Sequence, residues 1–257
     1  YLRDFLDGGD WRRMNTVFKF SVPASILLGL AGGLALARLW SLSSRVSGWL
    51  AVPWLAAAGL LLAGGLVFPV AGISDRVADR FPGARPPVGT LDGMAYMAVG
   101  EYAWPSGDSR IDLSSDHDAI KWLLDNVRGT PVLAEAPAGS YEVGNEWVSL
   151  DYYRAGGLRV ASLTGLPTFV GPHQFEQRSA DQVSLRSAKG MEFFRTTDLP
   201  AARRLAEELQ VRLVYVGQLE RLLFPEASLG KFDVLDAAGE LEIVYRNPGV
   251  TIYRVVD

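Results

Sequence analysis

The sequence predicts a membrane α-helical protein in which two transmembrane helices precede a globular α/β domain with a mixed sheet and a C-terminal β-hairpin. Two long apolar runs without charged residues lie in the first 73 residues. Helix-like and strand-like patterns alternate after residue 115, and two strand-like segments flank a Pro-Gly pair near the end. The mean hydropathy of +0.12 and the hydrophobic content of 49% fit a chain that lies partly in lipid and partly in water.

The first apolar run lies between Lys19 and Arg38, and the second lies between Arg45 and Asp75. As a helix the first run would rise about 27 Å, which is close to the ~30 Å thickness of the hydrocarbon core of a bilayer. The second run is longer than the first. The expected transmembrane helices are residues 17–39 and 48–73.

Two alternatives remain open for these runs. Each could be a buried helix of a soluble core, although two such runs joined by a short connector would make an unusual core. The first run could also belong to a signal peptide that starts at Met14 and is cleaved after Ala35-Leu36-Ala37. The chain starts at Tyr1 within a polar stretch, which indicates a fragment of a longer protein.

The charges around the two runs predict which face of the membrane the other segments occupy. The connector, residues 40–47, contains Arg45, follows closely after Arg38 and has no acidic residue, whereas both outer flanks mix acidic and basic residues. By the positive-inside rule the connector is cytoplasmic. Residues 1–16 then form an external loop, and the α/β domain, residues 115–257, is extracytoplasmic in a multi-pass protein of the cell membrane.

Composition excludes several classes of function. Residues 74–257 carry nineteen Lys and Arg against twenty-six Asp and Glu, so this part lacks the basic surface that nucleic-acid binding requires. Cysteine is absent, which rules out disulfides, zinc–thiolate sites and thiol nucleophiles. Histidine occurs only at His117 and His173, so a multi-histidine metal centre is excluded, whereas carboxylates could still bind magnesium, manganese or calcium.

The segment after the second apolar run, residues 74–114, is rich in Pro and Gly and predicts an extended linker. Regular structure is expected to resume at Ser115, which is spaced with Asp118 as a capping box for the helix DAIKWLLDNV. Gly129 ends that helix, and PVLAEA follows it as a strand.

The alternation of helices and strands continues to the C-terminus. We expect LRVASLTG as a strand, a helix near residues 182–194, DLPAARRLAEELQ as a helix capped by Thr197 or Asp198, and VRLVYVG as a buried strand. Helices between buried strands imply parallel strands with right-handed crossovers. LEIVYRN and VTIYRVV flank Pro248-Gly249 and predict an antiparallel hairpin that closes one edge of the sheet.

Ligand sites of α/β sheets lie where strands end and helices begin. Residues 135–144 (EAPAGSYEVG) and 217–221 (GQLER) are expected to lie in that position. Neither segment contains a phosphate loop or GxGxxG, so nucleotide binding is not supported, and the absence of GxSxG argues against a serine nucleophile. Glu220 and Arg221 are expected to form a structural ion pair at the start of a helix.

A first candidate site lies just before the first membrane helix and combines carboxylates, guanidinium groups and an amide. Its residues are Asp7, Asp10, Arg12, Arg13 and Asn15. The carboxylates could bind a divalent cation such as magnesium or manganese, or act as a base, and the arginines could hold the phosphate of a lipid carrier. The alternative is a hydrated loop whose arginines contact lipid headgroups.

A second candidate site is the segment GLPTFVGPHQFEQR, which contains His173, Glu176 and Arg178. His173 could act as a general acid or donate a hydrogen bond to a sugar, and Arg178 could face an anion. The alternative is a structural loop fixed by its glycines and prolines.

A third group is an acidic series, Asp108, Asp112, Asp116 and Asp118. It lacks the central Gly and the final Glu of a calcium-binding loop. Helix capping and solvation therefore explain it better.

Five motifs spread over nearly the whole chain carry a resemblance to a known family. They are RMNTVFKF (13–20), TLDGMAYM (90–97), DHDAIKWLLDNV (116–127), TGLPTFVG (164–171) and YVGQLER (215–221). Together they resemble the C-terminal part of the YYY membrane proteins, a domain-of-unknown-function family described as GT-C-type membrane glycosyltransferases. The most specific part of the resemblance is RMNTVFKF followed by a membrane helix.

The resemblance implies further transmembrane helices upstream of Tyr1, an external α/β domain and a polyprenyl-phosphate-linked sugar as donor. In enzymes of that architecture the catalytic acid lies in an early external loop, so this chain is expected to lack it. The family pattern continues after TGLPTxxG with Trp and then His-Glu, whereas Pro172, His173 and Gln174 follow here. The competing hypothesis is a nonenzymatic, membrane-tethered binding or assembly module.

Overall fold

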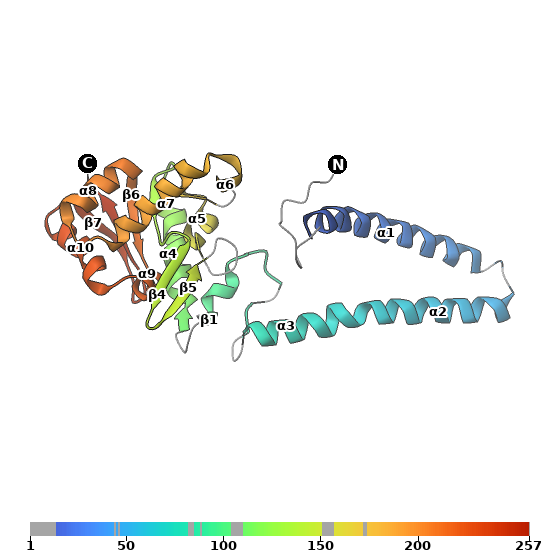
Figure 1. Ribbon diagram of the computed structural model, residues 1–257. Coiled ribbons are helices and arrows are strands. Elements are labelled where there is room, and N and C mark those ends of the chain that lie inside the picture. Colours follow the sequence, from blue (N-terminus) through green and yellow to red (C-terminus); the bar gives the residue numbers. More distant parts are fainter. Residues whose placement is uncertain are drawn as a thin grey trace. The chain divides into compact units, whose positions relative to one another are not determined.

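The computed structural model describes residues 14–43, 45, 47–81, 85–87, 89–103, 110–150, 157–171 and 174–256. The chain divides into two compact units, Tyr1–Arg76 and Val77–Asp257. The first contains the long helices drawn in blue to cyan in Figure 1, and the second contains the strands drawn in green to red. We call them the helical unit and the globular unit.

The helical unit consists of long apolar helices. α1 spans Met14–Ser43, and α2 spans Gly48–Val67 and continues as η2 (Phe68–Gly72) and α3 (Ile73–Arg80). The last four residues of α3, 77–80, already belong to the globular unit. Among the residues that the structure describes, two segments are long and apolar enough to cross a membrane, Lys19–Leu42 and Ala51–Asp79, and neither is buried. The prediction of two long apolar helices is therefore confirmed.

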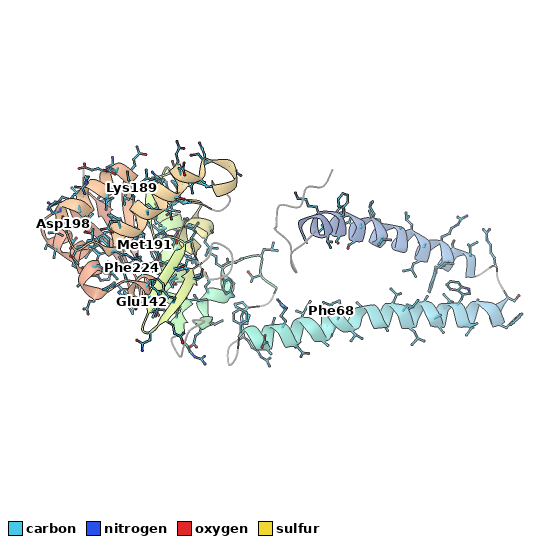
Figure 2. The ribbon with its side chains drawn as sticks, in the orientation of Figure 1. Phe68, Glu142, Lys189, Met191, Asp198 and Phe224 are labelled. Atoms are coloured by element: carbon cyan, nitrogen blue, oxygen red, sulfur yellow. The ribbon has the colours of Figure 1, made fainter. Side chains whose placement is uncertain are left out.

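The second helix differs from the prediction in two ways. It continues beyond Ile73 to Arg80, although the apolar run ends near Ile73. It also widens into a π-helical turn at Pro69, because a proline has no backbone N–H to donate to the preceding turn. Phe68, labelled in Figure 2, is 79% exposed on this part of the helix.

The predicted mixed sheet is confirmed in the globular unit. β3 (Val132–Ala134) and β6 (Val211–Val216) are parallel, whereas β8 (Thr251–Val255) is antiparallel to both β6 and β7 (Leu241–Arg246). The strand order is β3-β6-β8-β7. The predicted C-terminal hairpin thus supplies β7 and β8, with β7 at one edge of the sheet.

Helices cover both faces of this sheet (Figure 1). α4 (Leu113–Asn126) packs on one face, and α7 (Ala180–Arg195), α8 (Leu199–Leu209) and α10 (Glu226–Ala237) pack on the other. Side chains of β6 alternate between the two layers: Leu213 and Tyr215 join α4, whereas Val214 and Val216 face the opposite core. That opposite core is rich in phenylalanine, namely Phe169, Phe193, Phe194, Phe224 and Phe232.

Shorter elements complete the globular unit. β4 (Gly139–Val143) pairs with β5 (Glu146–Leu150), and β1 (Glu101–Ala103) pairs with β2 (Arg110–Asp112), both antiparallel. The short helices are η3 (Ala95–Ala98), α5 (Arg159–Thr164), α6 (Gln174–Gln177) and α9 (Gln218–Leu223). The sequence predicts an extended linker over residues 74–114, but the structure has the end of α3, η3, β1 and β2 there.

The prediction of a strand at LRVASLTG is wrong, because these residues form α5. Leu158 precedes the helix in the left-handed conformation, with a φ of 58°. The carboxylate of Glu135 then accepts hydrogen bonds from the first amides of the helix, those of Val160 at 2.9 Å and Ala161 at 2.8 Å. A short apolar run fits a strand or a helix equally well, and here a carboxylate distant in sequence stabilises the helix.

Two smaller predictions also need correction. Residues 135–144 are not one loop between a strand and a helix, because β4 begins at Gly139. α4 begins at Leu113 and not after Ser115, because Asp112 is its N-cap and accepts a hydrogen bond of 2.9 Å from the amide of Ser114.

Candidate functional site

A buried polar cluster lies where the two parallel strands of the sheet end. Glu135 follows β3 directly, and Glu220 lies in α9, which follows β6. Asp116 of α4, Arg159 of α5 and Tyr215 of β6 complete the group, which we call the Arg159 cluster. The carboxyl ends of parallel strands are the usual ligand-binding position of α/β sheets.

Arg159 is the centre of the cluster and bridges two carboxylates. It donates to Glu220 over 3.0 Å and 3.2 Å, and to Asp116 over 3.2 Å and 3.4 Å. The Arg159 side chain is 12% exposed, whereas the two carboxylates are 1% exposed or less. Burial lowers the pKa of Arg159, but the two carboxylates outweigh burial and hold that pKa well above its ordinary value. The guanidinium therefore stays charged.

Glu220 is held in its ionised form. Besides Arg159 it accepts hydrogen bonds from the amide of Ala136 at 3.1 Å and from that of Gly217 at 2.8 Å. Burial raises the pKa of Glu220, but the Arg159 charge and these hydrogen bonds outweigh burial, so the pKa is lowered. The predicted pair of Glu220 with Arg221 is therefore wrong, since Arg221 instead donates to the carbonyl oxygen of Gly249 at 2.6 Å.

The hydroxyl group of Tyr215 donates a hydrogen bond to the carboxylate of Asp116. Burial, followed by the negative charge of Asp116, raises the pKa of Tyr215 well above its ordinary value, so the hydroxyl keeps its proton. The guanidinium of Arg159 also lies 5.4 Å from the centre of the Tyr215 ring. Asp116 is thus a buried partner of two side chains and not the solvated residue that the sequence predicts.

Glu135 is the member of the cluster that titrates near neutrality. Its side chain is fully buried, and burial raises its pKa from 4.5 to about 7 against the opposing effects of Arg159 and of the amides of Ala161 and Val160. The nearby Glu220 adds a smaller rise. The cluster therefore contains three carboxyl groups and one guanidinium group. Glu135 is the carboxyl group that burial keeps protonated up to about pH 7.

We expect the free energy of unfolding to fall as pH rises from about 4.5 to about 7. In this range folded Glu135 keeps a proton that the unfolded chain releases. This difference in proton binding lowers the free energy of unfolding by roughly 3 kcal/mol over the whole range. Glu135→Gln should remove this fall, and the exposed Glu142→Gln should keep it. Denaturant unfolding followed by circular dichroism across pH measures the slope. The same slope in wild type and Glu135→Gln would contradict the role of Glu135.

The Arg159 cluster is arranged to connect structural elements. Its guanidinium joins α4, α5 and α9, Tyr215 adds β6, and Glu135 adds the end of β3. The described residues contain no group of three histidine or acidic side chains that could hold a metal ion. Through Glu135 the cluster fixes the start of α5.

The structure describes few of the residues that the sequence singles out. Asp7, Asp10, Arg12, Arg13 and His173 lie outside the described residues. Asn15 lies in α1 and Glu176 in α6, and the side chains of both lie outside what is described. Arg178 follows α6 and is exposed. The grouping of His173, Glu176 and Arg178 in one site therefore stays a prediction.

Sequence reasoning misses the Arg159 cluster because its members are far apart in the chain. Arg159 falls in a segment predicted as a strand, and Asp116 reads as one of four solvated acids. One signal could have found part of it: Glu135 directly follows the apolar residues of a strand, where an ionisable side chain needs a buried partner.

Comparisons with known proteins give a structural likeness for part of the chain. No protein-family model and no curated protein matches the sequence. The globular domain at the C-terminus of an oligosaccharyltransferase from Archaeoglobus fulgidus is similar in structure, with a TM-score of 0.35 and 14% identity. The match covers 54% of this chain and 95% of that domain. This likeness does not assign an activity to the chain.

Proposed function

We propose that the chain is the C-terminal part of a polytopic, GT-C-like glycosyltransferase that uses a polyprenyl-phosphate-linked sugar. In this proposal the globular unit lies outside the cytoplasm and assists the binding of the donor or the acceptor. The catalytic acid lies in a part of the parent protein upstream of Tyr1. The sequence motifs described above support the family, and the two apolar helices support the membrane location.

The observation that carries the proposal is the exposure of the apolar helices. Leu28 of α1 is 72% exposed and Leu61 of α2 is 78% exposed, and neither candidate span is buried anywhere in its most apolar window. Moving one leucine side chain from water to apolar surroundings lowers its free energy by about 1.5–3 kcal/mol. Rows of such residues on both helices require apolar surroundings, which lipid and further transmembrane helices of the parent protein would supply.

The proposal places the eight predicted site residues at the external membrane surface. Arg12 and Arg13 would bind the phosphate of the lipid-linked donor. Asp7 and Asp10, with Asn15, would hold a magnesium or manganese ion, which would offset the negative charge of the phosphate. His173, Glu176 and Arg178 would contact the sugar or the acceptor.

The test is a transfer assay with the full parent protein in proteoliposomes and a polyprenyl-phosphate sugar. We expect Arg12→Ala, Arg13→Ala and His173→Ala each to lower transfer by roughly tenfold or more, as the loss of a charge-assisted contact would. A chelator of divalent cations should also lower transfer. The exposed Arg204→Ala in the globular unit is the matched control and should leave transfer unchanged.

A second candidate, a nonenzymatic module that is tethered to the membrane and binds or assembles partners, is favoured by the Arg159 cluster. Its carboxylates are buried and its guanidinium bonds to two of them, so the cluster is built for rigidity. The upstream sequence separates the two candidates. The enzyme requires more transmembrane helices and an acidic residue in an early external loop, whereas the module requires neither.

A further inference from the structure

Three exposed side chains with apolar bodies lie in the segment that follows the second apolar helix. Leu91 is completely exposed, Val99 is 43% exposed and Tyr96 is 39% exposed. Tyr96 belongs to η3, a 3-10 helix, and Val99 is its C-cap, three residues further on. Residues three apart in a 3-10 helix lie on the same side of it. We call Leu91, Tyr96 and Val99 the η3 surface.

The η3 surface is fixed to the globular unit. Met97 of η3 is 2% exposed and packs in the core beneath α4. Side chains close the turn before η3: the amide of Asp92 donates to the hydroxyl oxygen of Thr90 at 3.0 Å, and the amide of Met94 donates to the carboxylate of Asp92 at 2.9 Å. Leu91 lies within this turn, so a defined backbone presents its side chain to the surroundings.

Phe81 connects the η3 surface to the end of α3. Its amide donates to the carbonyl oxygen of Val77 at 2.9 Å, so helical hydrogen bonding continues from α3 to this residue. The ring of Phe81 lies 6.1 Å from that of Tyr96, edge to face. Gly100 leaves space for this contact, because a Cβ there would lie 3.4 Å from the Phe81 ring. The η3 surface is therefore adjacent to the point where the chain leaves α3.

This point lies close to the expected membrane surface. The candidate span Ala51–Asp79 would rise about 43 Å as a helix, which matches the ~40–45 Å of a bilayer with both headgroup layers. Phe81 follows two residues later, at the outer edge of the headgroups. Residues 74–99 carry three arginines and three aspartates, so no net charge opposes contact with a zwitterionic lipid surface.

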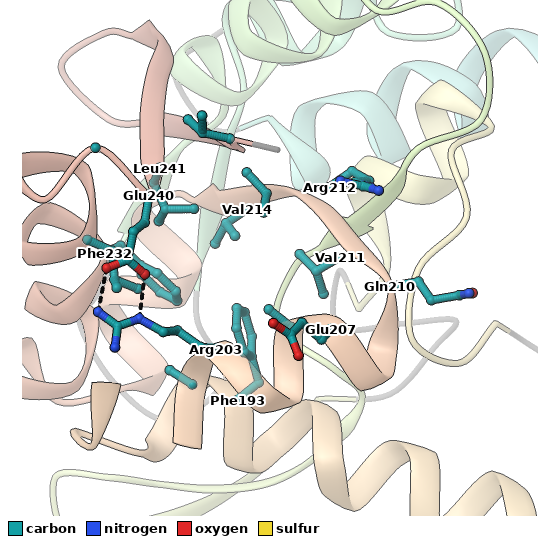
Figure 3. A pocket seen from close by; sticks show the side chains of 16 residues that line it. Phe193, Arg203, Glu207, Gln210, Val211, Arg212, Val214, Phe232, Glu240 and Leu241 are labelled. Atoms are coloured by element: carbon teal, nitrogen blue, oxygen red, sulfur yellow. Dashed lines mark hydrogen bonds and ion pairs between the residues drawn. The ribbon is translucent and has the colours of Figure 1, made fainter. Parts of the chain in front are cut away.

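A cavity elsewhere in the globular unit provides a contrast. It has a volume of about 740 Å³ and lies beside α8 and α10 (Figure 3). Its apolar lining includes Phe193, Val214 and Phe232, which are 2% exposed or less, and the ion pair of Arg203 with Glu240 lies at its rim. The fold already covers those apolar side chains. The side chains of the η3 surface are accessible and lose water only when a partner covers them.

We propose that the η3 surface contacts the headgroup and outer acyl region of the bilayer and seats the globular unit on the membrane. Leu91 would lie among the outer parts of the lipid chains, with Tyr96 and Val99 at the headgroup level, where tyrosine is enriched in membrane proteins. Lipid is the expected occupant because the chain leaves the candidate span directly beside this surface. The proposal rests on the membrane location of the helices and adds an orientation of the globular unit that the proposed function leaves open.

Single cysteines that carry an environment-sensitive fluorophore test this contact, because the chain has no cysteine of its own. The full chain is reconstituted in phosphatidylcholine vesicles. Leu91→Cys reports on the η3 surface, Leu61→Cys reports on the insertion of α2, and the exposed Leu185→Cys of α7 is the matched control. Lipids with a nitroxide high or deep in the acyl chain quench a fluorophore at the same depth. We expect at least about a twofold loss of emission at position 91 with the shallow nitroxide and at position 61 with the deep one, and no loss at position 185.

A substitution tests Leu91 without a label on it. In a chain that carries the fluorophore at Val99→Cys, Leu91→Asp should reduce quenching by the shallow nitroxide about twofold or more, because a carboxylate disfavours entry into lipid. Leu91→Met should keep the quenching, because its side chain stays apolar. Leu91 is completely exposed, so neither change disturbs the core.

The outcomes separate this contact from the anchoring of the helices. Quenching at position 61 but not at position 91 would overturn the contact and leave the membrane helix in place. Blue-shifted emission at position 91 without quenching would also overturn it, because protein and not lipid would then cover the surface. Equal quenching at positions 91 and 185, or unchanged quenching in Leu91→Asp, would mean that the η3 surface does not direct the contact. No quenching at position 61 would remove the membrane helix and the contact together.

Discussion

Replacing Arg159 with methionine is expected to lower the free energy of unfolding of the globular unit by about 3–5 kcal/mol. The change would leave the buried carboxylates of Asp116 and Glu220 without their shared cation. It would also separate α4, α5 and α9 at the point where these elements meet. Denaturant unfolding at pH 8, followed by circular dichroism in nanodiscs, measures the loss.

A matched control and a rescue variant show whether the loss of stability in Arg159→Met comes from the unpaired charges or from lost packing. Arg246→Met removes an exposed arginine that pairs with Asp233, and no measurable loss is expected because the pair is solvated. In a background that carries Asp116→Asn and Glu220→Gln, Arg159→Met should cost much less, because no uncompensated charge remains. A loss for Arg159→Met no larger than that of Arg246→Met would show that the cluster does not stabilise the fold.

A single arginine in the middle of either apolar helix is expected to prevent stable membrane insertion. Exchanging a leucine for arginine at the centre of a span costs about 3 kcal/mol on the insertion scale, which is roughly a hundredfold change in the inserted fraction. Leu30 lies near the middle of Lys19–Leu42, and Leu62 lies near the middle of Ala51–Asp79. Alkaline extraction of membranes that contain Leu30→Arg or Leu62→Arg measures how much chain stays inserted.

The control for these variants lies in the globular unit. Leu185 of α7 is 59% exposed, so it matches the two leucines in exposure but lies outside both candidate spans. Leu185→Arg should leave the inserted fraction unchanged. Extraction equal in all three variants would mean that the two helices do not cross a bilayer.

The sequence predicts most of the fold because its strongest patterns are local. The two apolar runs, the helices at α7 and α8, the buried strand β6 and the Pro248-Gly249 hairpin each have a period or a turn signal within a few residues. α5 fails this test. Its helix depends on the carboxylate of Glu135, which is 25 residues away in the chain. Local periodicity contains no information about such a partner.

The candidate site is harder to predict from the sequence, because its residues are also far apart in the chain. The Arg159 cluster joins residues up to 104 positions apart, from Asp116 to Glu220, so no local sequence pattern brings its members together. The residues that sequence reasoning does single out, such as Arg12 and His173, lie outside the described residues. Their roles rest on the family resemblance and remain predictions for the transfer assay.

The membrane location of the two helices and the external location of the globular unit are tested most directly by labelling single cysteines from outside intact cells that express the parent protein. Ser184→Cys lies on the exposed surface of α7, and Ser47→Cys lies in the connector between α1 and α2. Both are made in a background from which any native cysteine upstream has been removed. A maleimide that cannot cross membranes should label position 184 in intact cells and position 47 only after permeabilisation. Labelling of position 47 with protection of position 184, or recovery of the protein in the soluble fraction, would contradict an external globular unit anchored by two membrane-spanning helices.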